Sequence, residues 1–157
     1  MVYLSTGFSN SMAIEKWAAI ASIGLFAMFS GEMISIYYFM TNSPSDFEFG
    51  IVFEANPKIL QFISIGVGPA SILAALSFLM SRRYGSKPIG LMIIGGGVIM
   101  LVGMAICYSL IEHISDEFLT EAVVLTPVLF MVLSAPVIIV GAVLLNTKKK
   151  RPKKEYF

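Results

Sequence analysis

The chain's only histidine stands in a short acidic segment, and this is the place where residue types and spacing best suit metal chemistry. The segment begins at Glu112 and His113 and continues to Asp116 and Glu117. If it is helical, His113 and Glu117 lie one turn apart, a spacing that can hold a divalent ion. A histidine that is solvated or paired with a carboxylate is the alternative. We therefore assign no metal ligand and no catalytic residue here.

Glu32 is the only ionisable residue well inside a long apolar run. Counted back from Met40 at about 1.5 Å per residue, it lies roughly 12 Å below the outer boundary of a membrane crossed by that run. A charge at that depth costs on the order of 2.5–3.5 kcal/mol, so we expect Glu32 to be neutral, paired or facing a wet cavity. Polar residues predicted for the same half of the membrane form an intramembrane polar site with it: Ser35, Gln61, Ser64, Tyr108, Ser109 and Thr126.

Three roles are open for this polar site. The interpretation that we favour is a structural knot of hydrogen bonds, formed within this chain or with a partner subunit. A proton or cation relay through Glu32 is the second, because a carboxyl inside a membrane is a common coupling group. A contact with lipid headgroups is the third.

The sequence contains few residues or motifs suited to other kinds of chemistry. Cys107 is the only cysteine, which excludes an internal disulfide and a Cys-x-x-Cys redox centre. One histidine is too few to clamp a haem or to build a histidine-rich copper or zinc site. The sequence has no nucleophile elbow, phosphate-binding glycine loop or zinc-protease motif. We therefore expect a chain that is not an enzyme and binds no cofactor by itself, with bound lipid expected.

Four apolar runs of 22–24 residues position these side chains. Each exceeds the roughly 20 helical residues that cross a hydrocarbon core. The composition agrees, with 57% hydrophobic residues, 13% charged residues and a mean hydropathy of +0.83. Short connections make consecutive helices antiparallel neighbours. We predict an all-α, single transmembrane domain over residues 1–157, an up-down-up-down four-helix bundle with spans at about 17–40, 59–80, 88–111 and 122–145 and a basic tail over 146–157.

Basic and acidic residues lie on opposite sides of the four runs. One side holds ten of the eleven basic residues: Lys16, Arg82, Arg83, Lys87, Lys148, Lys149, Lys150, Arg151, Lys153 and Lys154. The other side holds Lys58 and seven of the ten acidic residues: Asp46, Glu48, Glu54, Glu112, Asp116, Glu117 and Glu121. The positive-inside rule then predicts a multi-pass protein of the cell membrane with both termini in the cytoplasm. The amphipathic rings of Tyr37 and Tyr38 are expected at the outer boundary.

Small residues indicate where helices should pack closely. Gly66, Ala70 and Ala74 recur four residues apart in the second run. Such a seam lets the backbone of another helix approach, and we therefore expect these residues at a helix contact. Gly96 and Gly103 are expected to play the same part in the third run.

Helix boundaries and bends are indicated by polar caps and prolines. Asn10 or Ser11 is the predicted cap of the first helix. Pro69 in the second run and Pro127 and Pro136 in the fourth lack a backbone donor, so both helices are expected to bend.

Two segments outside the runs are predicted contact surfaces. Residues 41–58 alternate acidic and aromatic side chains at Asp46–Phe49, a pattern typical of a strand with one apolar face. We expect that face to rest on the bilayer surface or to contact another protein. The tail Lys148–Lys154 carries six positive charges. We expect the tail to act as a topology determinant and to lie against anionic lipid. The alternative is a contact with an acidic partner or another polyanion. We predict no nucleic-acid partner.

The ending Arg151–Phe157, together with Met- and Ile-rich spans that contain glycine, resembles small membrane proteins of ammonia-oxidising archaea. In particular, it resembles an accessory subunit of the archaeal ammonia monooxygenase complex. The copper-binding subunits of that family need clustered histidines and carboxylates, and this chain departs from that pattern, so no copper ligand is carried over. The resemblance implies a helical accessory subunit packed against catalytic ones.

We therefore predict a non-catalytic accessory or structural subunit that stabilises a larger membrane protein complex, with an archaeal ammonia monooxygenase as the candidate complex. Its expected partners are other integral membrane subunits and lipids. The alternative is a small homo-oligomeric transporter or channel that is coupled to protons through Glu32.

Overall fold

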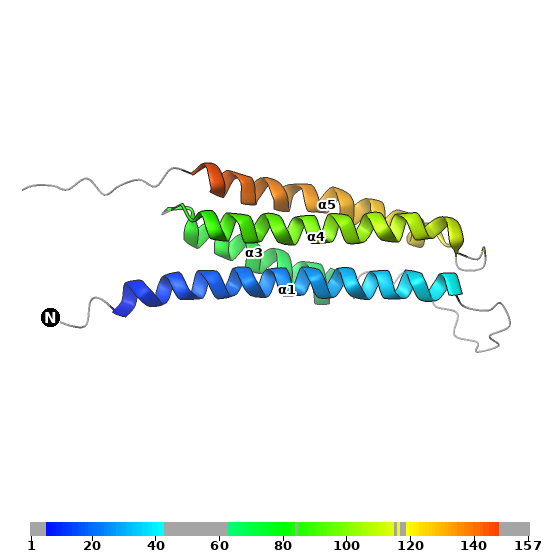
Figure 1. The fold of residues 1–157 in the computed structure, drawn as a ribbon, viewed down its shortest axis with the longest axis horizontal. Helices are drawn as coiled ribbons and strands as arrows, with labels where there is room; N and C mark the ends of the chain where they lie inside the picture. The colour runs from blue at the N-terminus through cyan, green and yellow to red at the C-terminus, as the bar shows by residue number, and fades with distance from the viewer. Residues whose placement is uncertain (1–5, 43–62, 84, 115, 117–118, 148–157) are drawn as a thin grey trace, which may run out of the picture.

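Every regular element in the described part of the chain is a helix. The computed structural model describes residues 6–42, 63–83, 85–114, 116 and 119–147, without the side chains of residues 6–13, 63 and 64. In chain order, the elements are α1 (Thr6–Asn42), a π-helical turn (Ile63–Val67), α3 (Gly68–Ser81), α4 (Lys87–Leu110), a 3₁₀ turn (Ile111–His113) and α5 (Glu121–Asn146) (Figure 1). The predicted all-α class is confirmed.

Three of the four helices are long and apolar enough to cross a membrane. Their apolar stretches are Ile14–Asn42, Lys87–His113 and Glu121–Asn146. They match the predicted runs 17–40, 88–111 and 122–145. A fourth stretch, Ile65–Ser81, is apolar but shorter. The first residues of its predicted run, 59–62, lie outside the described residues.

The start of α1 differs from the predicted boundary. The helix begins at Thr6, so Asn10 and Ser11 lie inside it and not at its cap. Serine or asparagine inside a helix costs no more than about 0.7 kcal/mol relative to alanine. Such a small cost does not end a helix that is able to continue, which explains the error.

The prolines of α3 and α5 have different surroundings. Pro69 stands in the first turn of α3, directly after the π-helical turn Ile63–Val67. A proline has no N–H for the carbonyl four residues back, and a wider turn accommodates that missing bond. Pro127 lies inside α5. The carbonyl of Val123, four residues earlier, therefore needs another donor.

The main helix contacts are those of α3 with α1, of α1 with α4 and of α4 with α5. α4 makes extensive contacts with α5 on one side and with α1 on the other, and α3 packs mainly against α1. α3 and α4 contact each other only sparsely, although a short connection joins them. The expectation that consecutive helices are neighbours therefore fails at this connection, because the small residues of α3 face α1.

Buried residues recur at spacings of three and four along α1 and α5. On α1 they include Ala19, Ser22, Phe26, Phe29, Met33 and Tyr37. On α5 they include Val123, Pro127, Phe130 and Ser134 and, two turns further on, Gly141 and Leu144. A mean spacing near 3.5 residues keeps one stripe of a helix turned toward its neighbours. The other faces of both helices are exposed in the single chain.

Glycines of α4 let α1 approach closely. A Cβ added to Gly96 would lie 2.8 Å from the Phe26 ring, and one added to Gly103 would lie 2.7 Å from Cβ of Ser30. Both distances are too short for a real side-chain contact. The two glycines are seven residues apart and so face the same neighbour.

A second pair of α4 glycines, Gly90 and Gly97, faces α5. A Cβ on Gly90 would lie 3.0 Å from the carbonyl oxygen of Gly141, and one on Gly97 would lie 2.7 Å from the Ile138 side chain. α4 therefore presents glycine to both of its neighbours, and this explains its central place.

The small-residue seam of the second run lies against α1. A Cβ on Gly66 would lie 2.9 Å from the Phe29 ring. Ala70 is completely buried, and Ala74 is 4% exposed. The structure thus places all three seam residues, like the two glycines predicted in the third run, at helix contacts.

Candidate intramembrane polar sites

Glu32 lies on the outside of the helix bundle. Its side chain and that of Ser35 are exposed on α1, because they fall off the stripe that contains Phe29 and Met33. No hydrogen bond or ion pair of Glu32 is found among the described residues. Within the described part of the chain, the expected convergence of polar groups on Glu32 does not occur.

The other members of the predicted polar site are also dispersed. Tyr108 and Ser109 are exposed on α4, and the Ser109 hydroxyl donates to the Ile106 carbonyl of its own helix at 2.7 Å. Gln61 and the side chain of Ser64 lie outside the described residues. A hydroxyl that bonds to its own helix is satisfied without a partner helix.

Among the described residues, the buried carboxylate is that of Glu15, which lies before the first predicted span. It is 7% exposed, and its Oε2 accepts a hydrogen bond from the Ser81 hydroxyl at 3.0 Å. The Ser77 hydroxyl donates to the backbone carbonyl of Glu15 at 3.2 Å. A carboxylate and two buried serines therefore tie the beginning of α1 to the end of α3. Glu15 lies four residues before Ala19 in the sequence, and this spacing was the signal that could have placed it on the buried stripe of α1.

Two further serines of α1 bond to neighbouring helices. The Ser22 hydroxyl donates to the Ala70 carbonyl of α3 at 2.8 Å. The Ser30 hydroxyl donates to the Ile99 carbonyl of α4 at 3.4 Å. A small hydroxyl bonded across helices in this way favours association where water is absent.

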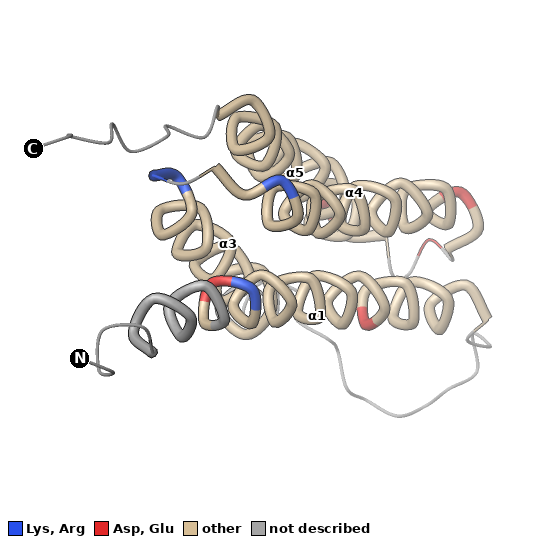
Figure 2. Tube along the Cα trace, turned by 60° about the vertical axis from the view of Figure 1, so that its left-hand side comes forward, with Lys and Arg blue, Asp and Glu red and all other residues tan. Residues whose placement is uncertain are grey.

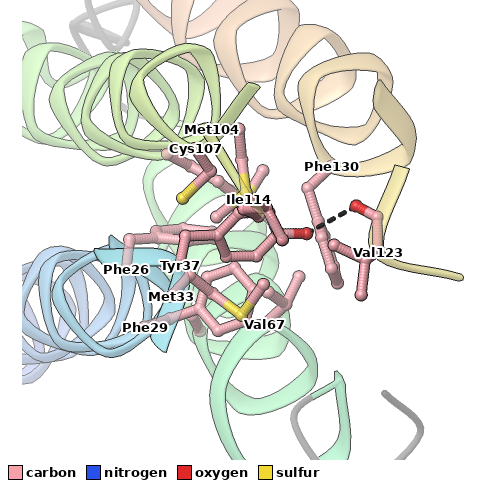
Figure 3. Close-up of a cluster of buried hydrophobic side chains, with 12 residues drawn as sticks. Phe26, Phe29, Met33, Tyr37, Val67, Met104, Cys107, Ile114, Val123 and Phe130 are labelled. Carbon is pink, nitrogen blue, oxygen red and sulfur yellow. Dashed lines mark hydrogen bonds between the residues drawn. The ribbon is translucent and has the colours of Figure 1, made fainter. Parts of the chain in front are cut away.

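At the other end of α1, the Tyr37 hydroxyl donates to the Val123 carbonyl at 2.6 Å (Figure 3). This carbonyl is the one that Pro127 cannot serve, so a side chain from α1 replaces the missing backbone donor of α5. Tyr37 is 2% exposed and Tyr38 is 62% exposed. The Tyr37 ring therefore packs inside the bundle, whereas the Tyr38 ring faces outward; the expected depth of both rings at the outer membrane boundary stays a prediction.

An apolar cluster surrounds the Tyr37–Val123 bond (Figure 3). The rings of Phe29 and Phe130 meet edge to face, with centroids 4.9 Å apart. The Cys107 thiol is buried in the same cluster. Side chains from α1, α4 and α5 thus exclude water from the hydrogen bond.

The described basic residues lie together at one end of the helices (Figure 2). Lys16, Arg82, Arg83 and Lys87 are all exposed there. The tail Lys148–Lys154 and the outer segment 43–58 lie outside the described residues.

The acidic segment with the histidine begins at the opposite end of the helices. The 3₁₀ turn ends at His113 and Ile114 is extended, so the helix that a one-turn spacing requires does not continue past His113. His113 and Asp116 are exposed, and Glu117 lies outside the described residues. The described residues contain no group of three His, Cys, Asp or Glu side chains placed to hold a metal ion.

Comparisons with family models, with curated proteins and with solved structures found no match to this chain.

Proposed function

We propose that this chain is a non-catalytic subunit that stabilises a larger membrane protein complex. The observation that carries the proposal is the exposed position of Glu32 on α1, ten residues before the helix ends at Asn42. Inside a bilayer this carboxyl meets either hydrocarbon or another chain, because the core holds no water. Facing hydrocarbon costs on the order of 2.5–3.5 kcal/mol, and a partner helix that covers the carboxyl removes that cost.

The proposed topology has four spans that run up, down, up and down, with both termini in the cytoplasm. Two contacts support this order: the beginning of α1 meets the end of α3 at Glu15 and Ser81, and the end of α1 meets the beginning of α5 at Tyr37 and Val123. The charges support the orientation, because the described basic side chains gather at one end of the bundle (Figure 2). The cell membrane is the proposed location.

The resemblance in the tail and spans makes an archaeal ammonia monooxygenase the candidate complex. In that proposal the metal centre belongs to other subunits, and this chain supplies helices that hold them together and contacts with lipid. The exposed aliphatic residues of α5, such as Leu125, Val132 and Ile139, suit a lipid-facing or subunit-facing surface.

A second candidate function uses the same glutamate. An exposed Glu32 is also where two copies of this chain would bring their carboxyls together, as a homo-oligomeric, proton-coupled transporter or channel requires. The two candidate functions predict complexes of different subunit composition. The first predicts unrelated subunits beside this chain, and the second predicts copies of this chain only.

Purification of the full chain from its native membranes in a mild detergent tests the proposal. We expect unrelated integral membrane proteins to co-purify in fixed stoichiometry through size exclusion. Recovery of the chain only as a monomer or homodimer would refute the subunit proposal.

Glu32→Gln separates the two candidates further. In a structural subunit the amide preserves assembly and the activity of the complex, because its carbonyl still accepts a hydrogen bond. In a proton-coupled protein, assembly stays intact and transport stops, since an amide cannot exchange the proton.

A further inference from the structure

We propose that the face of α1 around Glu32 docks a transmembrane helix of a different chain, and that this helix carries a lysine, arginine or histidine at the depth of Glu32. This docking face consists of Gly24, Ala27, Gly31, Glu32 and Ser35, all of them exposed. The inference rests on the proposed function and goes further by stating what the partner must present.

The backbone of the docking face is uncovered. A Cβ added to Gly24 or to Gly31 would meet nothing within 4 Å. By contrast, at glycines 90, 96, 97 and 103 of α4, neighbouring helices of the same chain already occupy the space that a Cβ would take. Ala27, Gly31 and Ser35 recur four residues apart, the spacing that lets a second helix backbone come close.

The docking face differs from the face that α5 presents. α5 exposes Leu125, Val132 and Ile139, which are large aliphatic side chains suited to lipid. The docking face exposes glycine, alanine and serine around a carboxyl, and its large exposed side chain is Met28, one turn before Glu32. None of its apolar side chains offers the carboxyl a hydrogen bond, so the face is completed by a surface that supplies a polar group.

Charge complementarity favours a basic side chain as the polar group, and a second copy of this chain cannot supply one at that depth. The four apolar runs contain no lysine, arginine or histidine. A second copy could therefore oppose Glu32 only with apolar groups, with neutral polar groups such as Ser35 or Tyr108, or with its own Glu32, and none of these carries a positive charge. A basic side chain from a different chain leaves the carboxylate paired, which is how charged residues persist inside membranes.

The test begins with the full chain in its native membranes, with a photo-reactive phenylalanine derivative in place of Ser35. Activated by light, the derivative should cross-link to a transmembrane segment of one other protein. Mass spectrometry of the cross-linked peptide should place a lysine, arginine or histidine inside that segment. Cross-linking only to lipid, to a second copy, or to a segment without a basic residue would overturn the inference.

Variants of the full chain then measure the contribution of the docking face in the purified complex. Glu32→Leu should dissociate at least about 30-fold faster, the loss typical of removing one partner of a buried charge pair. Glu32→Lys and Gly31→Leu should abolish the association. Gly95→Leu is the matched control, because Gly95 on α4 is also uncovered but has no ionisable neighbour in its run. It should leave dissociation unchanged.

The outcomes separate this inference from the proposed function. If unrelated subunits stay bound at an unchanged dissociation rate in Glu32→Leu, Glu32→Lys and Gly31→Leu, the docking face is wrong while the proposed function stands. If the unaltered chain co-purifies with no other subunit, the proposed function itself fails, and the inference fails with it. Circular dichroism of each variant checks that its helices are intact.

Discussion

Replacing Tyr37 by phenylalanine removes the side-chain donor of the Val123 carbonyl, which Pro127 cannot serve because it has no N–H. A buried acceptor that loses its partner costs about 1–3 kcal/mol. Hydrogen bonds between membrane helices average only about 0.6 kcal/mol, with a maximum near 1.7. The 2.6 Å bond has a 2% exposed donor and lies in an apolar cluster, so we expect a loss in the upper part of the range for membrane helices, about 1–1.7 kcal/mol.

A double-mutant cycle isolates this bond from the packing of the ring. Pro127→Ala gives α5 the N–H that its helix lacks, and this N–H can serve the Val123 carbonyl in place of Tyr37. Tyr37→Phe should therefore cost clearly less in the Pro127→Ala background than in the natural sequence. The difference between the two losses measures the coupling.

Reversible unfolding of the full chain in mixed micelles, followed by circular dichroism, supplies the free energies. Tyr38→Phe is the matched control, because this neighbouring ring is 62% exposed, and it should change stability by less than about 0.5 kcal/mol. Equal losses for Tyr37→Phe and Tyr38→Phe, or equal losses of Tyr37→Phe in both backgrounds, would refute the role assigned to the bond.

Three further predictions concern the buried carboxylate, the small-residue seam and the topology. Glu15→Leu should destabilise the chain by about 1–3 kcal/mol and Glu15→Gln by less, because only leucine leaves the Ser81 hydroxyl without an acceptor; equal losses in the same unfolding assay would contradict this. Ala70→Leu should disrupt the contact of α3 with α1, whereas Ala75→Leu on the exposed side of α3 should not. Disulfide cross-linking of cysteines placed in the two helices measures this contact. Equal cross-linking in the two variants would place the seam elsewhere. In a Cys107→Ser background, a cysteine at position 86 should react with a membrane-impermeant reagent only from the cytoplasm. A cysteine at position 45 should react only from outside. Labelling of position 86 in intact cells would show that the topology is the opposite one.

The sequence predicted the long helices well because hydropathy and length decide which segments are able to cross a membrane. The run 122–145 became α5 over Glu121–Asn146, and the run 88–111 became α4 over Lys87–Leu110. Pro88 in the first turn marks the start of α4, and the helices continue through the glycines of α4 and the prolines of α5. The start of α1 was missed because a serine or asparagine favours a cap without forbidding the helix interior.

The polar sites were harder to predict because they depend on how each helix is rotated about its axis. Depth in the membrane suggested that Glu32 would meet polar partners, but its rotation turns it outward. The buried stripe through Ala19, Phe26 and Met33 contains Glu15 and excludes Glu32. Reading that stripe with its spacings of three and four is the signal that would have identified Glu15. The bond from Tyr37 to Val123 joins residues 86 apart, and no local pattern predicts such a pairing.

Native mass spectrometry of the protein, released from its own membranes in nanodiscs, tests the central claim most directly. The claim is that this chain is a structural subunit of a larger membrane complex. The measurement should give one dominant mass that contains this chain together with unrelated membrane subunits in fixed numbers. A mass equal to one chain, or to a whole multiple of it, with only lipid added would contradict the claim.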